Sequence, residues 1–389
     1  MKAPTEIAGC GAANSRPVVV HVLHRFDTGG LENGVVNLIN HMPAFRHVVV
    51  AVTEITAFKE RVKAPGTQFI ALQKPPGQGF WLYPRFYKLL RELRPDIVHT
   101  RNLGAMEFQW PAWAAGVPLR IHSEHGWDVN DLGGVSRVNQ RLRRIYGVGT
   151  HRFVALSQVI EGYLTGPVGF PPDRVLRICN GVDTKRFVPA DVVPEHWPYR
   201  RQQHVVIGAV GRMQAVKDPL NLVDAFLRLR ELCPGDWQRL RLVMLGGGPL
   251  LDAARERLSQ AGAAGQSWLP GDRSDIPDLL PQFDIFALPS QAEGISNTLL
   301  EAMACGCAPV VTDVGGNAEL VEQGVNGLLV PSQDSATLAA ALARLVCEPE
   351  LRARLASASL ARVRAQFSLD GMVAAYAALY TGLTTADEA

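Results

Sequence analysis

The chain has 389 residues, a formal net charge of +2, 47% hydrophobic residues and 20% charged residues. This length exceeds one ordinary hydrophobic core and indicates two or three globular domains. No apolar run approaches the roughly 18 residues that cross a bilayer, which argues against an integral membrane protein. Six scattered cysteines favour reduced thiols over a disulfide framework.

The first half of the chain differs in charge from the second. Residues 1–190 carry 23 Lys and Arg against 14 Asp and Glu, and residues 191–389 carry 16 against 23. Either these are scattered solvated charges, or the first half meets an anionic partner. Two interpretations stay open for the aromatic and basic stretch 79–90 and the four arginines of 137–144: peripheral contact with an anionic membrane, or a solvated helix face. Residues 1–16 lack the apolar segment of a secretory signal, so we expect a disordered tail on a cytoplasmic protein.

Short runs rich in β-branched residues alternate with amphipathic segments along the chain. The runs predict strands at 17–23, 47–53, 96–100, 152–157, 205–211, 241–247, 283–289 and 308–314. Their apolar residues are almost continuous, as in parallel strands covered on both faces. Segments 31–42 and 219–232 have helical spacing, and Asp218 and Pro219 suit the N-cap and first residue of the second helix. The pattern predicts an α/β protein with parallel, doubly wound sheets.

The stretch 188–203 contains three prolines and separates the two series of strands. We therefore predict an N-terminal domain over 17–190, a C-terminal domain over 204–366 and a final helix over 367–389. Both domains would be Rossmann-like, and a ligand would bind at the carboxyl ends of their strands, in the cleft between them.

Several enzyme classes lack their signature in this chain. There is no phosphate loop of the form G-x-x-x-x-G-K-[ST] and no G-x-S-x-G nucleophile turn. The first glycine loop, at 28–34, is not G-x-G-x-x-G, so a dinucleotide site is not predicted. No two aspartates are spaced D-x-D, which removes the simplest divalent-metal clamp for a sugar nucleotide. We expect neither a metal nor a cofactor.

Three loops after predicted strands favour an anionic ligand. Gly29 and Gly30 precede a predicted helix, where backbone N–H groups bind anions, although a plain tight turn has the same sequence. Arg212 and Lys217 suit a diphosphate leaving group, against the alternative of solvated charges. Gly247 lies in a run of three glycines that permits close approach of a ligand.

The stretch EGISNTLLE carries two glutamates eight positions apart, Glu293 and Glu301. Ser296 or Asn297 is expected to cap a helix that contains Glu301. A fully helical stretch would hold the carboxylates about 12 Å apart, too far for the two carboxylates of a glycosidase to act on one bond. The spacing suits a long ligand with hydroxyls at both ends and an anion between them, as in a nucleotide diphosphate sugar.

These motifs resemble the retaining glycosyltransferase family 4 of GT-B fold over nearly the whole chain. The matching residues are Glu293 and Glu301, Arg212 and Lys217, Gly29-Gly30-Leu31-Glu32, His125-Gly126, Asn180-Gly181-Val182-Asp183 and Gly315-Gly316. Some details are similar to sugar transferases of exopolysaccharide or exosortase-linked loci. One departure is Asn33, which stands where many family members have arginine. The resemblance therefore does not define how the acceptor is bound.

The resemblance implies a role for each matching residue. Glu301 would hold the donor ribose, Arg212 and Lys217 the diphosphate, and Glu293 and His125 the sugar. The catalytic set would be His125, Arg212, Lys217 and Glu293. The donor-binding set would be Gly29, Gly30, Asn180, Arg212, Lys217, Gly247, Gly294, Ser296, Asn297 and Glu301. The last helix would cross back to the first domain.

The implied activity is metal-independent, retaining transfer of a hexose-type sugar from a nucleotide diphosphate sugar to a glycan or lipid-linked acceptor. A sugar-nucleotide epimerase and a catalytically dead sugar-nucleotide-binding protein remain alternatives. A nucleic-acid partner is not expected, because the basic residues are not interleaved with stacking aromatics along a known module.

Overall fold

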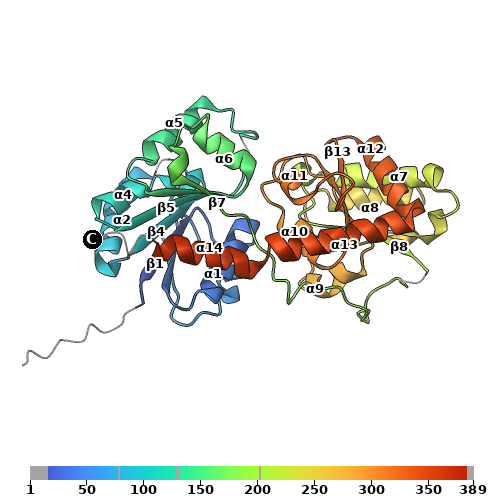
Figure 1. The fold of residues 1–389 in the computed structure, drawn as a ribbon, viewed down its shortest axis with the longest axis horizontal. Helices are drawn as coiled ribbons and strands as arrows, with labels where there is room; N and C mark the ends of the chain where they lie inside the picture. Colours follow the sequence, from blue (N-terminus) through green and yellow to red (C-terminus); the bar gives the residue numbers. More distant parts are fainter. Residues whose placement is uncertain (1–15, 78, 128–130, 201–202, 383–389) are drawn as a thin grey trace, which may run out of the picture.

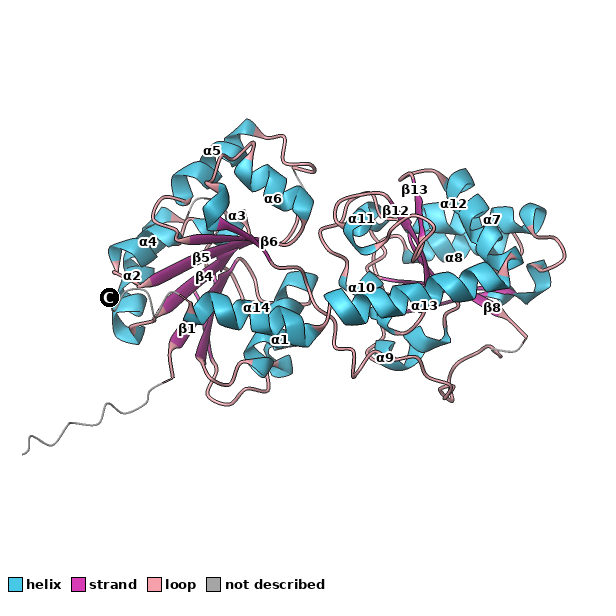
Figure 2. Cartoon of the chain, viewed as in Figure 1, coloured by secondary structure: helices cyan, strands magenta, loops and turns pink. Residues whose placement is uncertain are grey.

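The computed structural model describes residues 16–77, 79–127, 131–200 and 203–382. These residues form two domains side by side, each built on one parallel sheet with flanking helices (Figures 1 and 2). The predicted α/β class is confirmed. The expected disordered tail falls outside the described residues except for Arg16, and so does the end of the expected final segment from residue 383.

The N-terminal sheet has seven parallel strands in the order β3-β2-β1-β4-β5-β6-β7. Its strands are β1 (Val18–Leu23), β2 (Arg46–Ala51), β3 (Gln68–Ala71), β4 (Ile97–Arg101), β5 (Leu119–Glu124), β6 (Arg152–Ala155) and β7 (Val175–Arg177). The strand order reverses between β1 and β4, where Val20 lies beside both Val48 and Val98. Such a switch point opens a crevice at the carboxyl ends of the strands.

The helices of this domain are α1 (Gly30–His41), α2 (Tyr83–Leu93), α3 (Leu103–Met106), α4 (Gln109–Ala114), α5 (Arg137–Tyr146) and α6 (Gln158–Thr165). Serine side chains begin two of them, because Ser136 caps α5 and Ser157 caps α6 through hydrogen bonds to backbone N–H groups. Helices α2 and α4 pack on one face of the sheet around Phe86 and Phe108.

The C-terminal sheet has six parallel strands in the order β10-β9-β8-β11-β12-β13. Its strands are β8 (Val205–Val210), β9 (Leu240–Leu245), β10 (Ser267–Gly271), β11 (Ile285–Leu288), β12 (Ala308–Thr312) and β13 (Leu328–Val330). The helices are α7 (Pro219–Leu232), α8 (Leu251–Gln260), α9 (Ile276–Leu279), α10 (Asn297–Ala304), α11 (Asn317–Leu320), α12 (Ser335–Cys347) and α13 (Pro349–Gln366). Apolar side chains of α7, α8, α12 and the first half of α13 pack in one cluster of this domain, and those of α10 and the end of α13 pack in the other.

Helix α7 begins at Pro219, as predicted, but its N-terminus is not capped as expected. Asp218 occupies the N-cap position with φ 48°, in the left-handed region, and its side chain makes no capping hydrogen bond. The expectation of an Asp218 side-chain cap is therefore wrong.

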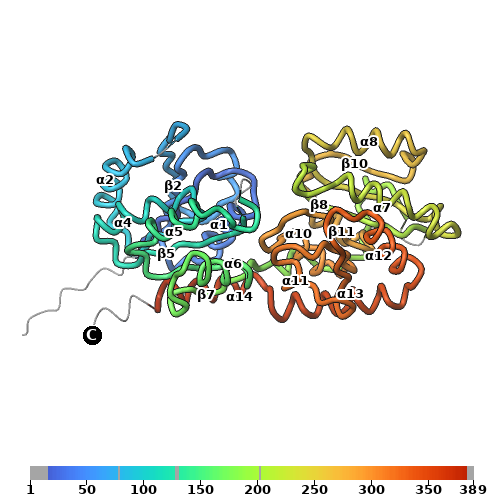
Figure 3. Tube along the Cα trace, turned by 90° about the horizontal axis from the view of Figure 1, so that it is seen from above, coloured from blue at the N-terminus to red at the C-terminus, as the bar shows by residue number. Residues whose placement is uncertain are grey.

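The final helix, α14 (Leu369–Thr381), returns to the N-terminal domain (Figures 1 and 3). Its Tyr376, Leu379 and Tyr380 pack in one apolar cluster with Ile97 and Ile121 of the first sheet. Before it, the chain runs beside the interdomain linker, where Val182 N–H donates to Phe367 O and Leu369 N–H donates to Val182 O. The predicted crossing of the C-terminal helix is confirmed.

The linker between the sheets is extended. β7 ends at Arg177 and β8 begins at Val205, and the described residues between them form neither a helix nor a strand. Within the described part of the chain, no helix is both long and apolar enough to cross a bilayer.

Candidate active site

A pocket of about 500 Å³ lies between the two domains. The predicted residues Asn180, Asn297 and Glu301 line it. Further lining residues come from the N-terminal domain (Thr28, Asn33, Asn37 and Arg61), from the linker (Asp183 and Arg186) and from the C-terminal domain (Val210, Arg273, Ser274, Ile276 and Thr298). A volume in this range is typical of small-molecule sites, and such sites commonly lie between domains.

Glu301 lies on α10 and contributes its carboxylate to this pocket. The helix begins after Ser296, whose hydroxyl accepts a hydrogen bond from Leu299 N–H, so the predicted serine cap is confirmed. Burial raises the pKa of the Glu301 carboxyl to about 7, and the charges of Arg186 and Arg61 partly oppose this shift. No hydrogen bond to this carboxylate is found among the described residues, so its lone pairs are available to a ligand.

Lys217 and Glu293 form an ion pair in the loops that follow β8 and β11. Lys217 Nζ lies 2.5 Å from Glu293 Oε1, and Ser290 Oγ donates to the same oxygen at 2.6 Å. Only 7% of the Glu293 side chain is exposed, compared with 30% of Lys217. The structure therefore joins two residues that the sequence reasoning had assigned separately to the sugar and the diphosphate. Glu293 holds Lys217 in place at the carboxyl edge of the sheet.

Arg212 extends from the end of β8 toward the N-terminal domain. Its side chain is exposed and forms no ion pair with a described residue. Burial raises the pKa of the Glu32 carboxyl on the opposite wall, and the charge of Arg212 partly opposes that rise. Arg212 thus supplies an unpaired cation to the cleft.

Gly29 and Gly30 form the start of α1, as predicted. Gly29 is the N-cap with extended backbone and offers no side-chain cap. The Glu32 carboxylate folds back to this point, because a Cβ at Gly29 would lie 2.1 Å from Glu32 Oε2. The Glu32 backbone N–H bonds its own carboxylate. An anionic group therefore already lies at the helix N-terminus, where N–H groups favour negative charge.

Asn297 bridges the two domains. Its Nδ2 donates to Gly30 O at 3.2 Å, and its Oδ1 accepts from Asn180 Nδ2 at 2.7 Å. A Cβ at Gly30 would lie only 3.2 Å from Asn297 Nδ2, so the absence of a side chain there permits the close approach. A second contact joins Gln158 N–H to the carboxylate of Glu319 at 2.6 Å.

A further close approach brings the loop after β5 against the loop after β11. A Cβ at Gly294 would lie 2.7 Å from His125 O, and Gly126 adopts φ 140° next to Gly294. Gly316 N–H donates to Gly294 O at 2.8 Å, and a Cβ at Gly315 would lie 1.9 Å from Glu293 O. These glycines allow three loops to meet at one point of the cleft.

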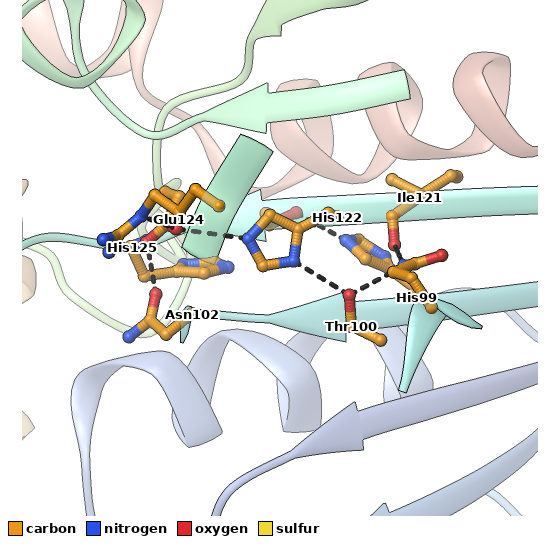
Figure 4. A network of polar contacts seen from close by, with 10 residues as sticks. His99, Thr100, Asn102, Ile121, His122, Glu124 and His125 are labelled. Carbon is orange, nitrogen blue, oxygen red and sulfur yellow. Dashed lines mark hydrogen bonds and ion pairs between the residues drawn. The ribbon is translucent and has the colours of Figure 1, made fainter. Parts of the chain in front are cut away.

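His125 is held at this meeting point by its backbone. Its N–H donates to Asn102 Oδ1 at 2.8 Å (Figure 4). Its ring Nε2 is buried and has no hydrogen-bond partner among the described residues. Burial, together with the charge of Arg101, lowers the pKa of the imidazole to about 3, so the ring is neutral near pH 7. A neutral ring with a free nitrogen is suited to a hydrogen bond with a ligand hydroxyl.

A chain of buried polar contacts supports the strand that ends before His125 (Figure 4). Thr100 Oγ1 contacts His122 Nδ1 at 2.8 Å, and His122 Nε2 contacts Glu124 Oε1 at 3.2 Å. The same carboxylate accepts from Arg143 Nε at 2.6 Å. Despite burial, the hydrogen bond from His122 and the charge of Arg143 lower the pKa of Glu124 to about 2. The ionised Glu124 therefore fixes α5 to β5.

Gly247 does not have a free amide group. Its N–H donates to Asp272 Oδ1 at 2.7 Å, and a Cβ there would lie 2.7 Å from Asp272 Oδ2. The neighbouring Gly246 and Gly248 pack against the carbonyl groups of Gly211 and Met213. The three glycines thus serve contacts between loops, and the predicted donor contact of Gly247 has no support in this geometry.

The pocket residues that sequence reasoning missed include Arg61, Arg186 and Asn37. Arg61 lies in a short 3₁₀ helix after β2, and its guanidinium lies over the Phe58 ring at 5.2 Å. Its carbonyl oxygen accepts from Asn40 Nδ2 at 3.0 Å, so its backbone is fixed to α1. Its position in the chain could have identified it, because Arg61 lies after the carboxyl end of β2, the strand next to β1.

Comparisons with known proteins agree with this architecture. Two family models match the chain. The model of Glycosyltransferase Family 4 matches residues 28–186, and the model of Glycosyl transferases group 1 matches residues 204–348. A D-inositol 3-phosphate glycosyltransferase from Actinosynnema mirum is 31% identical over 307 residues, covering 73% of this chain and 72% of that protein. The Escherichia coli UDP-Gal:alpha-D-GlcNAc-diphosphoundecaprenol alpha-1,3-galactosyltransferase is 29% identical over 273 residues, covering 67% of this chain and 68% of that protein.

Among solved structures, Anabaena HepE in complex with UDP and glucose has a TM-score of 0.79 at 21% identity, covering 94% of this chain and 100% of that one. A glycosyltransferase from Rickettsia africae has the same TM-score at 18% identity, covering 95% and 99%. The two facing sheets and the cleft between them therefore define a GT-B glycosyltransferase. The chain belongs to glycosyltransferase family 4. The family and the fold inferred from the sequence are both confirmed.

Proposed function

We propose that the protein transfers a hexose-type sugar, with retention at the anomeric carbon, from a nucleotide diphosphate sugar to a glycan or lipid-linked acceptor. We propose that this reaction belongs to cell-surface or exopolysaccharide synthesis on the cytoplasmic side of the membrane. Two similar proteins support the substrate classes. The Escherichia coli relative uses UDP-Gal and a diphosphoundecaprenol-linked acceptor, and Anabaena HepE was solved with UDP and glucose.

One observation supports the proposal above the others: the half-buried Glu301 carboxylate lines the pocket and receives no hydrogen bond from a described residue. Leaving a buried carboxylate unpaired costs stability, so a ligand with two adjacent hydroxyls is its natural partner. The ribose of a nucleotide has such hydroxyls. Arg212 and Lys217 line a smaller hollow that shares Val210 with this pocket, and there they would supply the cations that the diphosphate of the same ligand needs.

In the proposed reaction, the bond between the anomeric carbon and the diphosphate oxygen breaks. Arg212 and Lys217 stabilise the charge that develops on this leaving group, in place of a divalent cation. The acceptor hydroxyl attacks from the same face, forming the new glycosidic bond. Its proton passes to the departing diphosphate oxygen, so no base from the protein takes part.

His125 and Glu293 position the sugar and the cation in this scheme. The free Nε2 of the neutral His125 ring bonds a sugar hydroxyl near the anomeric carbon. Glu293 binds Lys217 in the unliganded protein, and a donor sugar can share this carboxylate through its hydroxyls. A neutral imidazole avoids placing a second positive charge beside a carbon that becomes cationic.

A thermal-shift screen against UDP-, GDP- and ADP-sugars identifies the donor, since tight binding stabilises the folded state by a few kcal/mol. Incubating that donor with acceptor glycans, in the presence of EDTA, should give a glycoside with the anomeric configuration of the donor by NMR. Inversion of configuration, or loss of transfer in EDTA, contradicts the proposed mechanism. A changed sugar nucleotide without acceptor would identify an epimerase, and binding without any product would identify a sugar-nucleotide-binding protein.

A further inference from the structure

Five aromatic side chains are exposed on the N-terminal domain: Phe80, Trp81, Tyr87, Trp110 and Trp113, which we call the aromatic face. Phe80, Trp113 and Trp81 are 64%, 57% and 45% exposed. Among the described residues, every exposed Phe, Trp or Tyr belongs to this set. Large aromatic side chains are normally buried, and a contiguous group at the surface marks an interaction site.

Part of the aromatic face forms a groove between α2 and α4. Tyr87 of α2 and Trp110 and Trp113 of α4 line an open apolar groove of about 370 Å³. Phe80 contacts Trp81 edge to face, with ring centroids 5.0 Å apart, just before α2. Helices α2 and α4 lie at the end of the N-terminal domain that points away from the C-terminal domain (Figures 1 and 3).

Helix α5 extends this surface. Trp110 Nε1 donates to Ile145 O at 3.0 Å. The Trp113 side chain packs on Gly149, where an added Cβ would lie 3.0 Å from Trp113 Cγ. The exposed residues Val138, Arg141 and Ile145 follow at helical spacing on one side of α5. Apolar and cationic side chains therefore alternate next to the aromatic face.

The charges around the aromatic face are almost all positive. Helix α2 carries Arg85, Lys88 and Arg91 against one acidic residue, Glu92. Helix α5 carries four arginines and no acidic residue. An anionic lipid surface attracts positive charge over the whole face. A protein partner has no general need for charges of one sign around the whole face.

Two arginines that the sequence assigned to a membrane surface have other partners. Arg143 is only 4% exposed and is bound to Glu124 within the domain. Arg144 donates from Nε to Val168 O and from Nη2 to Pro167 O, both at 2.6 Å. The expectation that all four arginines of 137–144 face an anionic surface is therefore wrong. Arg137 and Arg141 are exposed and remain available.

We propose that the aromatic face docks the protein on an anionic membrane, with the aromatic rings in the headgroup region and Lys88, Arg91, Arg137 and Arg141 against the lipid phosphates. Tyr and Trp concentrate at membrane interfaces because one end of the ring is apolar and the other is polar. Stable attachment of a peripheral protein usually takes two signals, and this surface combines apolar insertion with cationic attraction. The inference does not depend on which sugar is transferred.

Helix α5, beside the aromatic face, is connected to the cleft through one ion pair. Helix α5 is fixed through Arg143 to Glu124, and Glu124 is followed in the chain by His125. The N-terminal domain would stay on the lipid while the C-terminal domain, at the far end of the molecule, moves over the donor (Figure 1).

The test is co-sedimentation of the full-length protein with vesicles of phosphatidylcholine, alone or mixed with phosphatidylglycerol. Wild-type protein should bind the mixed vesicles, and the double variant Trp81→Ser/Trp113→Ser should lose at least about tenfold in binding. Brominated acyl chains should quench tryptophan fluorescence in the wild type. A matched control is Leu232→Ser, which removes an equally exposed apolar side chain from α7 and should bind as wild type does.

The charge contribution has its own variant. Lys88→Glu/Arg141→Glu should weaken binding to mixed vesicles at least about tenfold, while Arg228→Glu, on the exposed side of α7, should not. Unchanged far-ultraviolet circular dichroism and melting temperature establish that each variant is folded. If the wild-type protein does not co-sediment with mixed vesicles, the proposal is wrong. Full binding by the tryptophan variant, or a dimer in light scattering that the tryptophan substitutions dissociate, also overturns it.

Discussion

The raised pKa of Glu301 makes donor binding dependent on pH. The carboxyl has an ordinary pKa of 4.5, and burial raises it to about 7 in the unliganded protein. Ribose hydroxyls donate hydrogen bonds, and donated hydrogen bonds favour the ionised carboxylate. Binding of the donor should therefore lower the pKa of Glu301 and release a proton when the pH lies between these two values.

The size of the effect follows from the pKa shift. If the bound carboxyl returns to its ordinary pKa, the binding free energy gains up to about 3 kcal/mol, at 1.36 kcal/mol per pKa unit. Lowering the pH from about 7.5 to about 5.5 should then weaken binding about 20-fold, because the donor must compete with the proton. In the unliganded protein, the folded state holds this proton more tightly than the unfolded chain does. Stability should therefore fall as the pH rises from about 4.5 to about 7.

The assay is isothermal titration calorimetry with the donor sugar nucleotide, whose diphosphate diester does not titrate in this range. Measurements near pH 6 in two buffers of different ionisation enthalpy give the number of protons released, which should be about one. The Glu301→Gln variant keeps the size of the side chain and removes the ionisable group. It should release no proton and should bind with an affinity that does not change between the two pH values.

Two results would refute this reasoning. One is a pH dependence of binding that persists in Glu301→Gln, which would assign the proton to another group. The other is wild-type binding without proton release, which would mean that the donor does not bond this carboxylate. His125 does not interfere, because its imidazole pKa of about 3 lies below the range measured.

Three further predictions concern single side chains. Lys217→Ala should lower the initial rate of transfer at least about 100-fold, the scale for one preorganised charge, and near-wild-type rates would contradict the role in the leaving group. Tyr380→Phe removes the hydrogen bond of 2.8 Å to His99, and urea unfolding should show a loss of about 1–3 kcal/mol; an unchanged midpoint would mean that α14 is held by apolar contacts alone. Arg61→Ala should raise the donor KM about 10-fold with kcat nearly unchanged, whereas Lys59→Ala, on the same 3₁₀ helix, should change neither.

The fold was largely predictable because its central strands are buried on both faces. The run at 17–23 has no polar interruption except His21, and it became β1, a strand with every residue buried. Four of the five strands that the pattern did not reveal lie at sheet edges: β3, β7, β10 and β13. The fifth, β5, is a buried interior strand whose apolar run is broken by Arg120, His122, Ser123 and Glu124. β7 has three residues and only Val175 is buried, so neither its length nor its composition distinguishes it from a loop. Edge strands are fixed by their neighbours rather than by their own hydrophobicity.

The candidate site was predictable in part. Arg212, Glu293 and Glu301 were identified because each follows a strand at its carboxyl end. The partnership of Lys217 with Glu293 spans 76 positions and depends on how two loops meet, which no local pattern records. Arg143 shows the reverse error: a basic helical stretch predicts a solvated face, but one arginine is buried to neutralise Glu124.

Helix α14 has a consequence for how the protein is made. Tyr380 contacts Phe45 and His99 in the core of the N-terminal domain, yet it is synthesised about 200 residues after β7 completes the sheet. At roughly 5–20 residues per second, the apolar groove that receives α14 stays open on the ribosome for about 10 to 40 s. The first domain therefore reaches its final packing only after the second has been translated. A prematurely terminated chain would carry that groove uncovered, which marks it for chaperones and proteases.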